Sequence, residues 1–164
     1  APTAVRREET FTVRRLLVSL DGSEMAEAAL PAAVVLARGF GAGILLVMVV
    51  PTVATLTDDR AAAARLMPTA GAALLDAEAA EGATYLESVK TRLAREGVTV
   101  SAAVERGEPV HVLLDRLARP DVDLIVMATH GRSGVSAVWA GSVASRIVTR
   151  AAHPVLLIRI PRAE

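Results

Sequence analysis

Short apolar segments alternate with helical segments along this chain, and this alternation limits the folds that it can adopt. Residues 14–20, 44–50, 122–128 and 155–160 are rich in apolar side chains. In 14–20 these side chains do not alternate with polar ones, which is typical of a strand buried on both faces. Residues 98–104 do alternate, as expected of a strand with one less buried face. We therefore predict an α/β fold: a doubly wound, five-stranded parallel sheet with helices on both faces.

Four helices are expected between and after these strands. Ser23 suits the cap of the first, Pro31 should kink it, and Gly39 should stop it. The segment 52–70 is expected to be a long connection, which in a compact domain is often mobile or functional. The helical segments are 23–38, 72–95, 109–119 and 142–152.

Composition limits the functions that need to be considered. With 164 residues we expect a single domain over 13–164, preceded by a flexible tail over 1–12. The 18 basic residues are dispersed and balanced by 18 acidic ones, which argues against a nucleic-acid surface. The longest apolar run is too short to cross a membrane, and residues 1–13 lack the apolar centre of a signal peptide, so we expect a cytoplasmic protein. Without cysteine, thiol chemistry and cysteine–zinc sites are excluded.

A glycine-bearing loop follows the fourth predicted strand. It contains Gly131, Arg132 and Gly134, and it ends at Gly141-Ser142, where the last helix is expected to begin. Glycines let backbone N–H groups approach an anion closely, and a helix start adds free donors and a positive dipole end. The loop is therefore a candidate phosphate site.

A second candidate group follows the first predicted strand, where Asp21-Gly22-Ser23 turns the chain. This turn and residues 128–131 both lie at carboxyl ends of strands, so they share one crevice if strands one and four are neighbours. Structural roles alone also fit these residues: Asp21 can bond the N–H groups of its own turn, the glycines can serve loop geometry, and Ser142 can cap a helix without any ligand.

The order and spacing of these motifs resemble the universal stress protein family. The family's phosphate-loop pattern is Gly, two residues, Gly, nine residues and Gly-Ser or Gly-Thr. Gly131, the nine residues 132–140 and Gly141-Ser142 match it, whereas its first glycine falls on Ala128. Further motifs that match in order are Leu20-Asp21-Gly22-Ser23, Val49-Val50-Pro51 and Pro154-Val155-Leu156-Leu157-Ile158. The resemblance covers about residues 14–160.

The resemblance implies the strand order 3-2-1-4-5 and an ATP molecule between strands one and four, with Mg²⁺ bridging its phosphates. In ATP-binding members, the residue matching Asp21 contacts the ribose or adenine end, and the one matching Val49 contacts the adenine. Gly131, Gly141 and Ser142 match positions that hold the phosphates. The cofactor-binding set that we infer also takes in neighbouring residues, namely Met127, Ala128, Arg132, Gly134 and Val143.

We expect a stress-response protein that acts as an ATP-dependent switch, with an unidentified protein partner. The sequence has no P-loop motif, no nucleophile elbow and no metal-ligand spacing of histidines. Hydrolysis of ATP, if it occurs, should therefore be slow. The alternative is an interaction module of the same fold that binds no nucleotide, which the alanine at 128 would allow. The apolar edge segment Val155–Ile160 should pair with a second copy in a homodimer, as the resemblance also implies.

Overall fold

The computed structural model describes residues 11–130 and 143–160, and its centre is one parallel sheet. The strands lie in the order β3-β2-β1-β4-β5, which confirms the expected topology. β1 is the central strand and pairs with β2 on one side and β4 on the other, so that Leu17 lies opposite both Leu45 and Ile125. The chain reverses its winding between β1 and β4. The strands are β1 (Arg15–Ser19), β2 (Gly43–Val50), β3 (Val100–Arg106), β4 (Leu124–His130) and β5 (Val155–Ile160).

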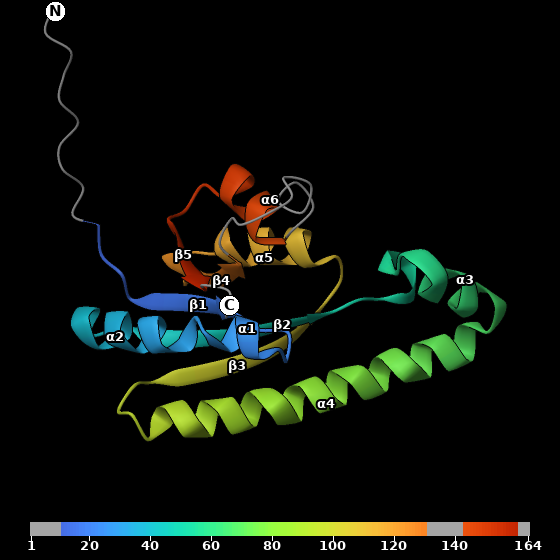
Figure 1. Ribbon diagram of the computed structural model, residues 1–164, viewed down its shortest axis with the longest axis horizontal. Coiled ribbons are helices and arrows are strands. Elements are labelled where there is room, and N and C mark those ends of the chain that lie inside the picture. Colours follow the sequence, from blue (N-terminus) through green and yellow to red (C-terminus); the bar gives the residue numbers. More distant parts are fainter. Residues whose placement is uncertain (1–10, 131–142, 161–164) are drawn as a thin grey trace, which may run out of the picture.

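Helices cover both faces of this sheet (Figure 1). On one face, α1, α2 and α4 bury side chains such as Leu30 and Leu86 against β1 and β2. On the other, α5 and α6 bury Leu113 and Ile147 against the same central strands. Each strand of the middle of the sheet is thus buried on both sides, as its continuous apolar sequence requires. The helices are α1 (Glu24–Glu27), α2 (Leu30–Phe40), α3 (Asp58–Leu66), α4 (Pro68–Ala94), α5 (Pro109–Leu117) and α6 (Val143–Arg150).

The first helical segment is divided rather than kinked. Ser23 caps α1 as expected, since its Oγ accepts a hydrogen bond from the Ala26 N–H at 3.1 Å. Pro31 lies in the first turn of α2, where its missing N–H costs nothing, and the chain breaks just before it. Gly39 does not stop the helix. α2 ends at Gly41, which has the positive φ of 65° that a helix C-cap often adopts.

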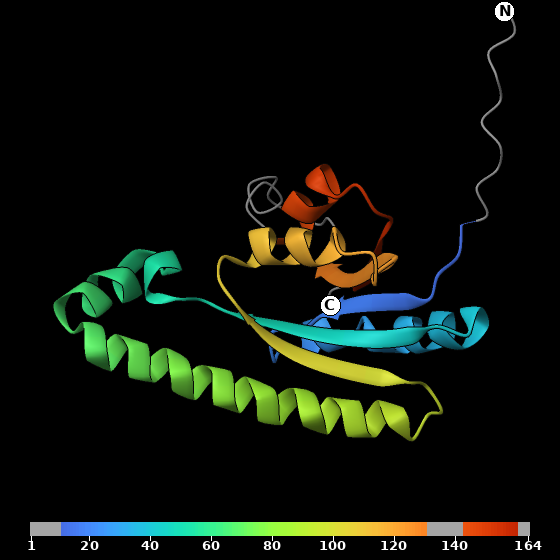
Figure 2. The same cartoon turned by 180° about the vertical axis from the view of Figure 1, so that it is seen from behind.

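The segment 52–70, expected to be an irregular connection, is mostly helical. A 3-10 turn (Val53–Thr55) leads into α3, and α4 already starts at Pro68. Alanine is abundant in both helices and has the highest helix propensity, which outweighs the turn signals of Pro68 and Gly71. Figures 1 and 2 show α3 and the first turns of α4 projecting beyond the carboxyl ends of the strands. We call this pair of segments the helical arm.

Close packing at Gly71 holds the helical arm together. A Cβ at this position would lie 2.9 Å from the Cβ of Ala64 and 3.2 Å from its Cα. We expect Gly71→Ala to destabilise the arm by about 1–3 kcal/mol, because the backbone of α3 must move away. Gly39→Ala is the matched control: Gly39 is helical with no atom within 4 Å of the added Cβ, so this change should stabilise by about 0.5–1 kcal/mol. Thermal melts of both variants measure the difference, and equal melting temperatures would contradict this packing.

Candidate functional site

Asp21 lies at the carboxyl edge of the sheet, directly after β1. Its Oδ1 accepts hydrogen bonds from the Ser23 N–H at 2.9 Å and from the Ser23 Oγ–H at 2.6 Å. The turn is therefore stabilised locally, as the purely structural interpretation of Asp21 predicts. The residue is nevertheless exposed, and within the described part of the chain these bonds engage Oδ1 only. The second carboxylate oxygen, Oδ2, remains for hydroxyl donors of a ligand.

Two apolar candidates lie in the neighbouring strands, β2 and β4, on the carboxyl side of the sheet. Val49 is half-buried near the end of β2 and packs against the core on the side of α5 and α6. It therefore offers apolar surface of the kind that suits a flat base. Met127, in β4, is only 6% exposed and its side chain belongs to the same core. Its backbone, rather than its thioether, is what it can present to a ligand.

Ala128 lies inside β4, where the sequence pattern of the resembled family has glycine. β4 extends to His130, two residues farther than the sequence predicts, and Ala128 pairs with Ile158 of β5. The backbone at this position is therefore extended, a conformation that alanine adopts without strain. This position does not require a positive φ, so alanine at 128 causes no backbone strain.

The glycine-bearing loop itself falls outside the described residues, with Gly131, Arg132, Gly134, Gly141 and Ser142. The structure describes its two ends: β4 stops at His130, and α6 starts at Val143, which is half-buried against the core. α6 contacts both β4 and β5. Of the sequence-predicted set, the structure thus brings Asp21, Val49, Met127, Ala128 and Val143 to the carboxyl side of the sheet.

Glu108 ties α6 to α5 near this edge. One carboxylate oxygen, Oε2, accepts from the His111 N–H at 2.8 Å and so caps α5. The other, Oε1, accepts from Arg146 Nη1 of α6 at 2.9 Å. Burial would raise the pKa of Glu108, but these hydrogen bonds outweigh it and hold the pKa below the usual 4.5. The sequence marks Glu108-Pro109 as a helix start, but the contact with Arg146 joins residues far apart in the chain and leaves no local signal.

Acid should weaken this link between α5 and α6. Because the pKa of Glu108 is lower in the folded chain than in the unfolded one, its contribution is fully present above 4.5 and is lost as pH falls through the lowered value. We expect Glu108→Gln to cost about 0.5–1 kcal/mol near pH 7, since the pair is partly exposed. The gap between the unfolding free energies of wild type and variant should narrow in urea titrations as pH falls below 4.5. A gap that stays constant with pH would contradict an ionised Glu108.

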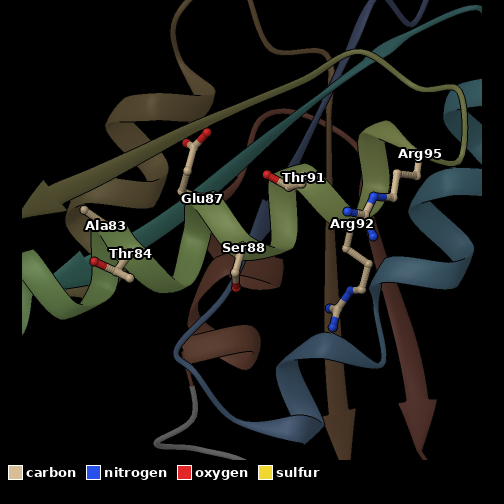
Figure 3. A pocket seen from close by; sticks show the side chains of 7 residues that line it. All are labelled: Ala83, Thr84, Glu87, Ser88, Thr91, Arg92 and Arg95. Atoms are coloured by element: carbon tan, nitrogen blue, oxygen red, sulfur yellow. The ribbon is translucent and has the colours of Figure 1, made fainter.

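One other hollow on the surface lies away from the Asp21 turn. A shallow hollow of about 830 Å³ lies on the solvent side of α4, where Thr84, Ser88, Thr91 and Arg92 are among its lining residues (Figure 3). Every lining residue lies on this one helix or is its C-cap, Arg95, away from the carboxyl ends of the strands. Among residues 11–130 and 143–160, no group of three or more acidic or histidine side chains is placed to hold a metal ion. In the same ranges, no helix is both long and apolar enough to span a membrane.

Comparisons with known proteins agree with this architecture. Residues 12–159 match the profile of the Universal stress protein family. The chain is 30% identical over 145 residues to universal stress protein YxiE of Bacillus subtilis, an alignment that covers 88% of this chain and 98% of the relative. The solved universal stress protein UspA from Lactobacillus plantarum is 27% identical and superposes with a TM-score of 0.73, over 90% of this chain and 99% of that one.

Two solved structures with the same fold contain nucleotides. One is a universal stress protein in complex with cAMP, with 18% identity, a TM-score of 0.61 and coverage of 90% of this chain and 98% of that one. The other is the universal stress protein from Archaeoglobus fulgidus in complex with dAMP, with 19% identity, a TM-score of 0.60 and the same coverage. At these identities the likeness establishes the fold alone.

Proposed function

This chain belongs to the universal stress protein family, and on that premise we propose that it binds ATP between the carboxyl ends of β1 and β4. The observation that carries the proposal is the exposed Asp21 carboxylate at the point where the sheet reverses its winding. In open parallel sheets, ligands bind beyond the carboxyl ends of the strands at such points. Relatives of this fold in complex with cAMP and dAMP support an adenine nucleotide as the ligand.

Each part of the nucleotide has a matching chemical group. Oδ2 of Asp21 suits a ribose hydroxyl, and the apolar end of β2 at Val49 suits the adenine ring. For the phosphates we propose the loop residues Gly131, Gly141 and Ser142, helped by backbone donors at the start of α6. Mg²⁺ prefers to keep several waters and to bind phosphate oxygens, so it needs few ligands from the protein.

We further propose that the ATP-bound form acts as a switch in a cytoplasmic stress response, with little or no hydrolysis, through a homodimer and a protein partner. β5 is an edge strand and carries apolar residues over most of its length, which supports self-pairing there. Light scattering should give the mass of a dimer. A monomer at micromolar to millimolar concentration would contradict pairing through Val155–Ile160.

Titration calorimetry with ATP and Mg²⁺ tests the nucleotide proposal. We expect saturable binding of one ATP per chain, weakened by Gly131→Val and by Ser142→Ala. GTP is the matched control ligand, since it shares the ribose and the phosphates and differs only in the base. The absence of binding at millimolar ATP would contradict the proposal and favour an interaction module that holds no nucleotide.

A further inference from the structure

A partly buried cluster of hydrogen bonds joins α4 to the short helix α1. The Tyr85 hydroxyl of α4 donates to Glu27 Oε1 of α1 at 2.8 Å. Arg92, about two turns farther along α4, donates from Nη2 to Glu27 Oε2 at 2.5 Å. Both oxygens of Glu27 are therefore bound by α4. This cluster ties the last residue of α1 to residues of α4 that are more than fifty positions away in sequence.

The protonation states in this cluster are fixed near neutral pH. Burial raises the pKa of Tyr85, and the Glu27 carboxylate beside it raises it further, so the phenol keeps its proton. Burial would raise the pKa of Glu27, but hydrogen bonds from Arg92 and Tyr85 outweigh it and lower that pKa. The charge of Asp21 also contributes to the raised pKa of Tyr85.

The Asp21 turn is attached to the other end of α1. Ser23 caps this helix and also donates both of its hydrogen bonds to Asp21 Oδ1, so Asp21, Ser23 and α1 form one hydrogen-bonded unit. α1 has only four residues, far fewer than a helix needs to be stable by itself. Its orientation therefore depends on contacts with the rest of the fold: Ala26 packs in the core, and Tyr85 and Arg92 bind its last residue, Glu27.

Packing links α4 to the same turn by a second route. Met48 of β2 lies between the two: a Cβ on Gly82 of α4 would lie 2.6 Å from its Sδ, and a Cβ on Gly22 would lie 3.8 Å from its Cε. Gly82 is buried, and the missing side chain makes room for the thioether. Two separate contacts, one polar and one apolar, thus run from α4 to Glu27 and Gly22, which both follow Asp21 closely in the chain.

We propose that Tyr85 is a positioning residue for nucleotide binding: through Glu27 and α1 it holds the Asp21 carboxylate where it meets the ribose hydroxyls. The inference rests on the proposed function and adds to it a residue on a different helix. Removing the Tyr85 hydroxyl should loosen α1 and lower the share of chains in which Asp21 Oδ2 is aimed at the ribose. The loss should fall on the ribose contact and not on the base or the phosphates.

The test compares ATP with 2′,3′-dideoxy-ATP by calorimetry. For the wild type, removing both ribose hydroxyls should weaken binding roughly tenfold or more, as expected for a hydrogen bond to a charged group. We call the affinity for ATP divided by the affinity for dideoxy-ATP the ribose ratio. For Tyr85→Phe the ribose ratio should shrink to about threefold or less, and dideoxy-ATP should bind to this variant as tightly as to the wild type. Thr84→Ala is the matched control, because its hydroxyl donates within its own helix, to Ala80 O at 3.1 Å. Its ratio should equal that of the wild type.

A conservative change at Glu27 separates positioning from folding. Glu27→Gln keeps an oxygen that can accept from the Tyr85 hydroxyl, so it should retain more of the ribose ratio than Glu27→Ala. If folded Tyr85→Phe has the same ribose ratio as the wild type, the inference is overturned and the proposed function still stands. Equal affinities of the wild type for ATP and for dideoxy-ATP would also overturn the inference. A wild type that binds no ATP would overturn the inference and the proposed function together.

Discussion

Replacing Asp21 with alanine should lower the affinity for ATP about tenfold to a hundredfold. The change removes an acceptor that is charged and exposed at the carboxyl edge of β1, and hydrogen bonds to charged groups contribute about 1.5–3 kcal/mol. The remaining affinity should no longer depend on the ribose hydroxyls. Calorimetry with ATP and with 2′,3′-dideoxy-ATP measures both effects.

Ser23→Ala is the control for the structural role of Asp21. This variant removes the helix cap and one of the two bonds to Asp21 Oδ1, but it leaves the carboxylate in place. It should cost about 1 kcal/mol of stability, the usual effect of losing a serine cap. We expect a smaller loss of ATP affinity than for Asp21→Ala, since the carboxylate and its bond from the Ser23 N–H remain, although the weaker link to α1 should lower the ribose contribution in part. Equal losses in the two variants would mean that Asp21 only stabilises its turn.

Replacing Ile147 with alanine should have the largest effect on stability, with a loss of about 2–5 kcal/mol. Ile147 is fully buried on α6, where it packs into the core formed with α5 and the central strands. The neighbouring Val148 is 41% exposed on the same helix. Urea unfolding of Ile147→Ala and Val148→Ala measures the contrast.

Val148→Ala should change the free energy of unfolding by no more than about 0.5 kcal/mol, as is usual for surface positions. The two variants alter the same helix at adjacent residues, so helix propensity cannot explain a large difference between them. Similar losses in both would contradict the placement of α6 with Ile147 inward. They would also remove the support for the helix that follows the glycine-bearing loop.

The sheet could be predicted from the sequence because its signals are local. Each strand is a short apolar run, and the resemblance supplied the order in which the strands pair. Ser23 was identified as a cap from its own position and from the acidic residues that follow it. The helical arm is not predicted from the sequence, because Pro68 and Gly71 are typical of turns. Pro68 instead occupies a first helical turn, and Gly71 allows the close approach of Ala64.

The candidate site was predictable at its chain positions but not in its contacts. The sequence places Asp21 after one buried strand and Ala128 within another. The pairing of β1 with β4 brings these two strands together. Whether alanine at 128 strains the backbone depends on where β4 ends, and strand ends are poorly marked in sequence. The sequence around Tyr85 carries no signal of its role, because its partner, Glu27, lies on another helix. Only a compact fold brings the two together.

The most direct test of the nucleotide site is to map the amide resonances that shift when ATP and Mg²⁺ are added to the isotope-labelled protein. We expect the largest shifts at the Asp21–Ser23 turn, at the ends of β2 and β4, and at the start of α6. Shifts confined to the outer face of α4, or no shifts at millimolar ATP, would contradict a nucleotide bound between β1 and β4.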